Sequence, residues 1–307
     1  MQLPDITKIT VDKIHDPLFQ SRDLQLDVLR LDKIHPVISG NKWFKLKSHL
    51  VNYNAGNYNG ILTFGGAWSN HIVATACTCR LLKIKCAGII RGENPPQLSI
   101  TLKQAMEYGM QLEFVTREKY QQRSNAHFIN SLEKEYPGFY VIPEGGAGHI
   151  GEKGAGEIMD IVKSRHYTHI ACAVGTGTMF NGIKKMALPG QQIVGTVVLK
   201  GWSARSLERS HDGPSEEKEV LSSENLICDY HFGGYAKHTP ELLSFMNEFY
   251  KHSNIPTDFV YTGKLAFAIY DLVRKDRFPP GSKILMIHSG GLQGNTSLQK
   301  GSLIFQD

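Results

Sequence analysis

Cysteine is scarce in this chain, with five among 307 residues: Cys77, Cys79, Cys86, Cys172 and Cys228. An odd number of cysteines cannot all pair with one another, and most of these lie in apolar stretches. We therefore expect reduced, partly buried thiols in a cytoplasmic protein. Cys77 and Cys79 have no second cysteine pair nearby at the spacing of a zinc site, so metal binding is disfavoured.

Long apolar runs are also missing. No stretch approaches the roughly 18 apolar residues of a membrane-spanning helix, and residues 1–5 lack the basic and then apolar layout of a secretory signal. Charge of one sign is not in large excess, because 34 basic residues against 29 acidic ones leave a formal net charge of +5. That excess favours the approach of anionic ligands but is too small and too scattered to indicate nucleic-acid binding.

What is present is typical of a folded chain: 41% of the residues are hydrophobic and 21% are charged, and 307 residues suffice for about two domains. Short apolar runs alternate with helical patterns, and we predict strands at residues 61–64, 86–90, 112–115, 140–142, 169–174, 193–199 and 284–287. Such runs suit strands buried on both faces, with helices as parallel crossovers. The pattern predicts an open, mostly parallel α/β fold that binds ligands beyond the carboxyl ends of its strands.

The first segment that carries chemistry is Ser39-Gly40-Asn41-Lys42-Trp43-Phe44-Lys45. Two lysines three positions apart share one face of a helix. A solvated basic helix start is the plain interpretation. The aromatic neighbours favour another, because a lysine in apolar surroundings has a lowered pKa and can act as an amine nucleophile or as a base.

The second segment, Gly65 to His71, joins a predicted strand to a predicted helix. Ser69 could simply cap that helix. The free amides of a helix start also form a carboxylate site, which would leave the Asn70 side chain to bond a ligand oxygen. For His71 a structural role is the stronger expectation.

Two more glycine turns follow predicted strands. Gly175-Thr176-Gly177-Thr178 offers backbone amides, hydroxyl donors and a helix start, which indicates a phosphate cradle; a glycine-rich turn without a ligand is the alternative. The loop matches neither a Walker sequence nor the full dinucleotide fingerprint, so a plain dinucleotide-binding protein is disfavoured. After the last strand, His288-Ser289-Gly290-Gly291 delivers a hydroxyl, which could also only cap a turn.

Together these parts fit one ligand. A lysine amine can form an imine with an aldehyde, the glycine-threonine loop can hold a phosphate, and a polar side chain can meet a ring nitrogen. This combination predicts pyridoxal 5′-phosphate (PLP) as the cofactor.

The order of the segments resembles the fold-type II PLP enzymes related to tryptophan synthase β, and within them the 1-aminocyclopropane-1-carboxylate deaminase and D-cysteine desulfhydrase family. The resemblance runs from about Val28 to Gly291 and combines Gly40-Asn41-Lys42, Gly65-Gly66 with Ser69-Asn70-His71, Gly175-Thr176-Gly177-Thr178, Tyr261-Thr262-Gly263-Lys264 and His288-Ser289-Gly290-Gly291. It implies a homodimer and a tryptophan synthase β-like α/β fold of two mostly parallel three-layer domains. The large domain would comprise residues 1–44 and 143–307, and the small one residues 45–142.

Carried over residue by residue, the resemblance implies roles for the polar residues. Lys42 forms the covalent link to the cofactor and shuttles the substrate's Cα proton. Asn70 hydrogen-bonds the cofactor's 3′ oxygen. Ser69, with the backbone amides of Asn70 and His71, receives the substrate carboxylate.

The same resemblance assigns the cofactor phosphate to Val174, Gly175, Thr176, Gly177 and Thr178, with Lys45 as an extra charge. It places Tyr235 and Tyr261 beside the substrate and the cofactor.

Two positions bear on the reaction. Thr262 stands where the cyclopropane deaminases have a glutamate that meets the pyridine nitrogen, and Ser289 supplies the hydroxyl that the desulfhydrases use there. A hydroxyl makes the ring a weaker electron sink, which suffices for elimination of a good leaving group. We therefore predict a PLP-dependent lyase that converts a small amino acid to a 2-oxo acid and ammonia, with D-cysteine as the leading substrate. The alternatives are 1-aminocyclopropane-1-carboxylate deaminase and a PLP-binding protein without lyase activity.

The chain also departs from the family pattern. Phe44 stands where the family usually has arginine, and Ile72-Val73 replace a polar pair. Trp202, in the unmatched segment Lys200 to Ala204, could narrow the pocket. These differences concern the substrate more than the cofactor.

Overall fold

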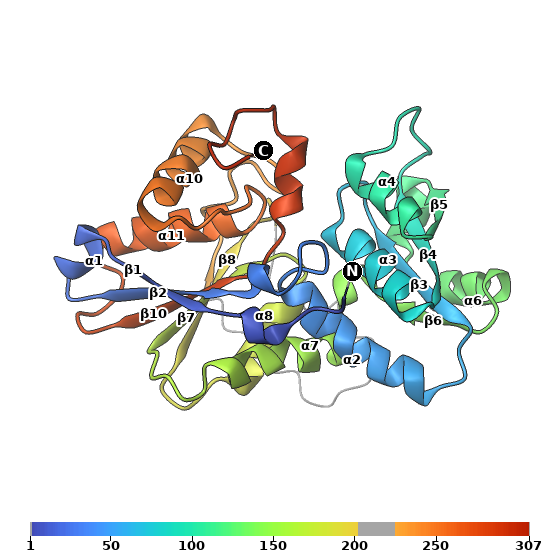
Figure 1. Cartoon of the computed structure of the whole chain (residues 1–307), viewed down its shortest axis with the longest axis horizontal. Helices are drawn as coiled ribbons and strands as arrows, with labels where there is room; N and C mark the ends of the chain where they lie inside the picture. Colours follow the sequence, from blue (N-terminus) through green and yellow to red (C-terminus); the bar gives the residue numbers. More distant parts are fainter. Residues whose placement is uncertain (1, 202–224, 307) are drawn as a thin grey trace.

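A computed structural model describes residues 2–201 and 225–306 of the chain, so Trp202 and its predicted effect lie outside the described residues. The strands form two separate sheets (Figure 1). The larger has the order β1-β2-β10-β7-β8-β9 and consists of β1 (Val11–Ile14), β2 (Gln25–Arg30), β7 (His169–Val174), β8 (Gln192–Val197), β9 (Leu226–Ile227) and β10 (Lys283–His288). The smaller has the order β5-β4-β3-β6 and consists of β3 (Gly60–Gly65), β4 (Lys85–Arg91), β5 (Gln111–Val115) and β6 (Phe139–Ile142).

Helices cover both sheets. In chain order they are α1 (Pro17–Gln20), α2 (Asn41–Ala55), α3 (Asn70–Leu82), α4 (Ile100–Glu107), α5 (Arg117–Gln121), α6 (Ala126–Glu135), α7 (His149–Gly156), α8 (Thr178–Met186), α10 (Pro240–Ser253) and α11 (Thr262–Arg274). Figure 1 shows α10 and α11 on one side of the larger sheet, with α7 and α8 on the other. None of the helices within the described residues is long and apolar enough to cross a membrane.

Each apolar run that we predicted as a strand forms one, with ends shifted by at most two residues. All neighbouring strands pair in parallel except β1 and β2, which confirms the mostly parallel α/β prediction. The sequence analysis did not find β1, β2 or β9. In β2 the buried charges Asp27 and Arg30 interrupt the apolar pattern, and each has a polar partner: the Tyr167 hydroxyl donates to Asp27 at 2.8 Å, and Arg30 pairs with aspartates.

The central strands are buried on both faces, as their apolar runs predicted. In β7, Ile170, Cys172 and Val174 join the core on the side of α7 and α8, whereas Ala171 and Ala173 join the core on the side of α11. The smaller sheet likewise lies between two apolar cores, one shared with α3 and α4 and one shared with α6. Burial on both faces leaves the strand ends as the places where polar groups meet a ligand.

The two sheets draw on different parts of the chain. All strands of the smaller sheet lie within residues 60–142, and all those of the larger sheet lie outside that range. Helix α2 runs without a break across the boundary at 44/45 that the resemblance implied. The domain limits at 44/45 and 142/143 stay a prediction.

Four of the cysteines are buried and form no disulfide, as expected: Cys77, Cys79, Cys86 and Cys172. Cys228 is exposed, which corrects the expectation of a partly buried thiol at this position. It directly follows β9, a two-residue strand at the edge of the larger sheet, so no neighbouring strand covers it on that side.

The entry to α2 lies directly on the turn that follows β10. The Asn41 amide donates to the Ser289 carbonyl at 3.2 Å, and Gly40 has φ +63°. A Cβ at position 40 would lie 1.8 Å from the Ser289 carbonyl oxygen. Only glycine allows this approach, which fixes the first turn of α2 against the end of β10.

We predict that Gly40→Ala destabilises the protein by about 3 kcal/mol or more, because left-handed strain and overpacking add together. Urea unfolding followed by circular dichroism would measure the loss. Gly109→Ala is the matched control: Gly109 has φ +90° but nothing within 4 Å of a Cβ, so only the strain applies and the loss should be about 1 kcal/mol. Equal losses in the two variants would contradict the close approach.

Candidate active site

One pocket gathers residues from segments far apart in the sequence. It is lined by Ser39, Asn41, Lys42, Asn70, Ala173, Tyr261, Ser289, Gly290, Gly291 and Gln293. The lining includes four of the predicted site residues: Lys42, Asn70, Tyr261 and Ser289. Asn70 and Ser289 follow β3 and β10, so the pocket lies at the carboxyl ends of strands, where we expected it.

A second depression lies at the opposite edge of the smaller sheet. Its lining includes Asn59, Lys85, Gln111 and Phe139, which stand immediately before or at the first residue of β3, β4, β5 and β6. Amino-terminal strand ends present no helix N-termini to a ligand. We therefore place the site in the first pocket.

Lys42 lies in the first turn of α2 with its side chain partly buried. Burial lowers the pKa of its amine to about 8, against a smaller opposing effect of the Asp258 carboxylate. A substantial fraction of this amine is therefore neutral near physiological pH, as an attack on an aldehyde requires.

Lys45 lies one turn further along α2, and its Nζ donates to the Gly145 carbonyl at 3.3 Å. Burial, and then the neighbouring charge of Lys42, hold its pKa well below the usual lysine range. The two lysines share one face of α2, as their spacing predicted. An anion beside Lys45 would favour its charged form, which is compatible with the phosphate role; that role stays a prediction.

The segment after β3 has the two functions expected of a strand-to-helix junction. Ser69 caps α3, since its Oγ accepts from the Ile72 amide at 3.4 Å. Asn70, the first residue of the helix, lines the pocket, and its buried Oδ1 has no protein partner among the described residues. An orphaned buried acceptor beside free helix amides indicates a polar ligand at this place.

The side chain of His71 is structural. Its Nε2 lies 2.8 Å from the Thr63 hydroxyl, and that hydroxyl donates its one proton to the Ile142 carbonyl at 2.9 Å. His71 must therefore donate from Nε2, which leaves Nδ1 as an acceptor. The backbone amide of His71 stays available at the start of α3, and its predicted contact with a substrate carboxylate remains a prediction.

The glycine-threonine loop joins β7 to α8. Gly177 has φ +84° and caps α8, and the hydroxyls of Thr176 and Thr178 lie 2.9 Å apart. A Cβ at Gly175 would lie 3.2 Å from the Tyr261 ring, so the loop adjoins the pocket wall. A helix start with two hydroxyls beside the lysine pocket suits a phosphate.

Tyr261 and Tyr235 meet edge to face, with ring centroids 6.1 Å apart. Burial raises the pKa of both phenols, so each stays protonated at physiological pH. Tyr261 lines the pocket, whereas Tyr235 contacts Tyr261 from outside the pocket lining and is 41% exposed, so its predicted place beside the substrate stays a prediction. The structure thus brings together the two tyrosines that the sequence separates by 26 positions.

Lys264 is a positioning residue that the sequence analysis missed. Its fully buried amine donates to the carbonyls of His231 and Gly234, both at 2.8 Å. These bonds fix the turn that precedes Tyr235. Its only signal in the sequence was its place at the end of Tyr261-Thr262-Gly263-Lys264.

Asp258 was also missed. Its Oδ1 accepts from the amides of Val260 and Tyr261, and its Oδ2 accepts from the Thr262 amide and, at 2.6 Å, from the Thr262 hydroxyl. These four bonds fill the acceptor sites of the carboxylate. Burial nevertheless raises its pKa above the usual aspartate value. Asp258 thereby fixes the backbone that carries Tyr261, at the start of α11.

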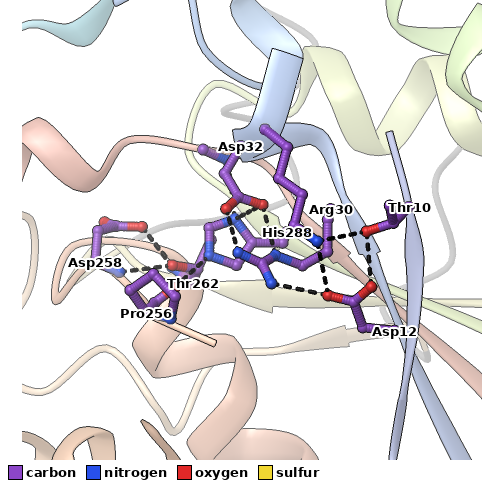
Figure 2. A network of polar contacts seen from close by, with 10 residues as sticks. Thr10, Asp12, Arg30, Asp32, Pro256, Asp258, Thr262 and His288 are labelled. Atoms are coloured by element: carbon purple, nitrogen blue, oxygen red, sulfur yellow. Dashed lines mark hydrogen bonds and ion pairs between the residues drawn. The ribbon is translucent and has the colours of Figure 1, made fainter. Parts of the chain in front are cut away.

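A buried charge network anchors the turn that carries Ser289 (Figure 2). Arg30 binds Asp32 through two bonds of 2.8 and 2.6 Å, and Asp32 lies 3.3 Å from Nδ1 of His288. Nε2 of His288 lies 2.7 Å from the Pro256 carbonyl. Burial by itself would raise the pKa of Asp32, but His288 and Arg30 together lower it. His288 directly precedes Ser289, so the network holds that hydroxyl at the pocket.

These residues fit PLP. The pocket joins a partly neutral lysine amine, an orphaned amide oxygen and a hydroxyl, and a helix start suited to phosphate adjoins it. Lys42 would hold the aldehyde carbon, residues 175–178 the phosphate, and Asn70 and Ser289 the ring. The fold and the pocket therefore define a PLP-dependent enzyme.

Comparison with known proteins supports this class. The family model for pyridoxal-phosphate dependent enzymes matches residues 16–290, and the chain belongs to that family. A Pyrococcus abyssi protein provisionally named as a 1-aminocyclopropane-1-carboxylate deaminase is 28% identical over 293 residues, covering 89% of this chain and 87% of that one. The mitochondrial bifunctional D-cysteine desulfhydrase/1-aminocyclopropane-1-carboxylate deaminase of Arabidopsis thaliana is 27% identical, covering 84% of this chain and 70% of that one.

Solved structures show the same fold. One described as a 1-aminocyclopropane-1-carboxylate deaminase homologue is 23% identical, with a TM-score of 0.78 and coverage of 95% of this chain and 93% of that chain. A hydrogen sulfide-producing enzyme from Fusobacterium nucleatum is 16% identical, with a TM-score of 0.66 and coverage of 93% and 96%. The predictions of a fold-type II PLP enzyme and of its cofactor are confirmed.

The lowered pKa of Lys42 predicts how the cofactor-stripped protein takes up PLP. Because the neutral amine is the nucleophile, the rate of covalent attachment should rise with pH and level off above about 8. Stopped-flow absorbance after mixing with PLP would give the profile. A midpoint near the ordinary lysine value of 10.5 would contradict the burial of this amine.

We predict that Lys264→Met loosens the turn before Tyr235 and lowers the free energy of unfolding by about 2–3 kcal/mol, because two buried carbonyls lose a charged donor. Hydrogen exchange of residues 231–236 should accelerate. Lys237→Met, a change of an exposed lysine in the same region, is the control and should leave both quantities unchanged. Unaltered exchange in Lys264→Met would refute the positioning role.

Proposed function

We propose that this PLP-dependent enzyme is a lyase that eliminates the β-substituent of a small amino acid and releases a 2-oxo acid and ammonia, with D-cysteine as the leading substrate. D-cysteine and water would give pyruvate, hydrogen sulfide and ammonia. Support comes from the similarity to a bifunctional D-cysteine desulfhydrase and from the hydroxyl at the ring-binding position.

The observation that carries this choice concerns Thr262. Its hydroxyl is fully buried and donates to Asp258 at 2.6 Å, and that carboxylate is itself saturated by four bonds. Neither group is free to hold a ring proton. Ser289, which lines the pocket, is then the group that meets the ring nitrogen, and a hydroxyl favours a weak electron sink.

The residues divide the work as follows. When bound, PLP supplies an aldehyde and an electron-accepting ring. Lys42 takes the Cα proton on Nζ, because burial lowers the pKa of its amine to about 8 and so leaves a fraction of it neutral as a base. The amides at the start of α3, with Ser69, hold the substrate carboxylate. Tyr261 walls the pocket and Tyr235 packs against it, with both phenols protonated.

A second candidate is 1-aminocyclopropane-1-carboxylate deaminase, an activity that the names of both relatives include. It would release 2-oxobutanoate and ammonia. Opening of the ring has no thiolate leaving group and calls for a stronger sink than Ser289 provides. A PLP-binding protein without lyase activity is the third candidate, from a different class.

The resemblance also supports a homodimer, and cysteines without disulfides support a cytoplasmic location. Light scattering of the holoenzyme would give the mass; a monomer would overturn the dimer without affecting the chemistry.

We expect borohydride reduction of the holoenzyme, followed by peptide mapping, to label Lys42. Lys42→Ala should abolish the label and lower turnover by at least about three orders of magnitude, since both the covalent link and the base are lost. Lys45→Ala, one turn away on the same helix face, is the matched control and should keep the label on Lys42. A label on another lysine would overturn the site.

A panel of D- and L-amino acids with 1-aminocyclopropane-1-carboxylate, scored for 2-oxo acid release, separates the three candidates. Pyruvate from D-cysteine in excess of every other product supports the desulfhydrase. 2-Oxobutanoate from the cyclopropane as the main product supports the deaminase. Labelled Lys42 with no 2-oxo acid from any compound supports the binding protein.

A further inference from the structure

Two guanidinium groups share the face of one aromatic ring at the edge of the smaller sheet. The Cζ of Arg91, the last residue of β4, lies 5.9 Å from the centroid of Tyr120. The Cζ of Arg123 lies 5.1 Å from the same centroid. Tyr120 itself is buried in α5.

The two arginines differ in their partners. Arg123 forms an ion pair of 2.6 Å with Glu144. Within residues 2–201 and 225–306, Arg91 is exposed and has no carboxylate in ion-pair contact. The two guanidiniums thus have only one carboxylate nearby, Glu144, which pairs with Arg123 and leaves the charge of Arg91 without an ion-pair partner among the described residues.

The free charge lies beside the loop that receives the substrate carboxylate. Gly65 pairs with Ile90 in the sheet, so Gly66 and Arg91 leave neighbouring strands together. The Nη2 of Arg91 lies 3.4 Å from where a Cβ at Gly66 would be. A Cβ at position 66 would just contact the guanidinium, so Arg91 lies directly beside this loop.

The opposite wall of the site lies within reach of the same charge. Arg91 lowers the pKa of Tyr235, a minor effect against the burial that raises it. Tyr235 meets Tyr261, which lines the lysine pocket. Arg91 stands at the carboxyl end of β4, beside Gly66 and outside the residues that line the lysine pocket.

We propose that Arg91 binds a negative charge on the β-substituent of the substrate, so that the enzyme prefers amino acids with a second anionic group beyond Cβ. The inference rests on the proposed function and specifies its substrate class. The α-carboxylate goes to the amides of α3, and the second anion goes to the arginine on the adjacent strand.

The charge also suits the bond that breaks. The Cα proton passes to Lys42, the Cα–H electron pair forms the Cα–Cβ double bond, and the substituent leaves with the Cβ–X pair as an anion. Water then hydrolyses the enamine to the 2-oxo acid and ammonia. Arg91 stabilises the departing anion, including the hydrosulfide of cysteine. A cyclopropane substrate offers no such anion.

The test compares aspartate with asparagine, in both enantiomers, as ligands of the PLP-loaded enzyme. Their side chains have the same shape and differ in charge. Binding is read from the cofactor absorbance and as inhibition of the best substrate found. Wild type should bind aspartate at least about tenfold more tightly, the factor expected of a charge-assisted contact.

Arg91→Gln should remove that preference and leave the asparagine affinity within about twofold, and Arg91→Lys should retain part of it. Arg123→Gln is the matched control, because this arginine stacks on the same ring but is neutralised by Glu144; the preference should persist. Equal effects of Arg91→Gln on both ligands would overturn the proposal. So would a wild-type enzyme that favours asparagine or binds neither.

Failure of the lyase proposal is distinguishable. A holoenzyme labelled at Lys42 that releases no 2-oxo acid still reports aspartate and asparagine binding through its absorbance. In that case the two ligand affinities still test the charge preference of Arg91, independently of the lyase proposal.

Discussion

The pocket depends on one close approach of two backbone segments, the entry to α2 at Gly40 and the turn at Ser289. The Asn41 amide donates to the Ser289 carbonyl, and no side chain fits between the two segments. This contact sets the position of the Lys42 amine relative to the Ser289 hydroxyl. In the proposed arrangement the two groups reach one ring from opposite ends, so their spacing has to be fixed by the backbone.

The buried charges around the pocket also hold its backbone segments in place. His288 and the Arg30–Asp32 pair hold the Ser289 turn from beneath, and Asp258 holds the start of α11 that carries Tyr261. Breaking such a buried pair costs about 3–5 kcal/mol, so the turn is firmly anchored. Lys42, by contrast, has no carboxylate in contact among the described residues. Burial therefore lowers the pKa of its amine to about 8 with little opposition, and the neutral fraction is the form that a nucleophile needs.

The sequence predicted the parts of the molecule that follow local rules. The strands found from it, such as β7, are continuous apolar runs, and the glycine turns follow them at the edge where ligands bind. β2 escaped detection because the charges of Asp27 and Arg30 interrupt its apolar pattern, and their partners Tyr167 and Asp12 lie outside the strand. Lys264 was missed because its carbonyl partners, His231 and Gly234, lie at least 30 positions away. Asp258 bonds only residues 260–262, a local pattern that the sequence analysis overlooked.

Four of the predicted site residues could be found because several sequence segments, each a weak signal by itself, indicated the same ligand. Lys42, Asn70, Tyr261 and Ser289 do line one pocket. The pairing of Tyr235 with Tyr261, and the neutralisation of Arg123 but not Arg91 by Glu144, required the fold. Charge balance between distant residues has no signature in a single sequence.

Helix α2 touches both halves of the molecule: it packs on α7 beside the larger sheet and on α3 beside the smaller one. Its first turn is pinned to Ser289, whereas Lys45 reaches Gly145 from the next turn. If the smaller sheet moved relative to the larger one, the amine of Lys42 would stay with the larger sheet. The change in backbone position would then occur in the second and later turns of α2. In such a movement the Lys42 amine would keep its position relative to Ser289, while the later turns of α2 would move with the smaller sheet.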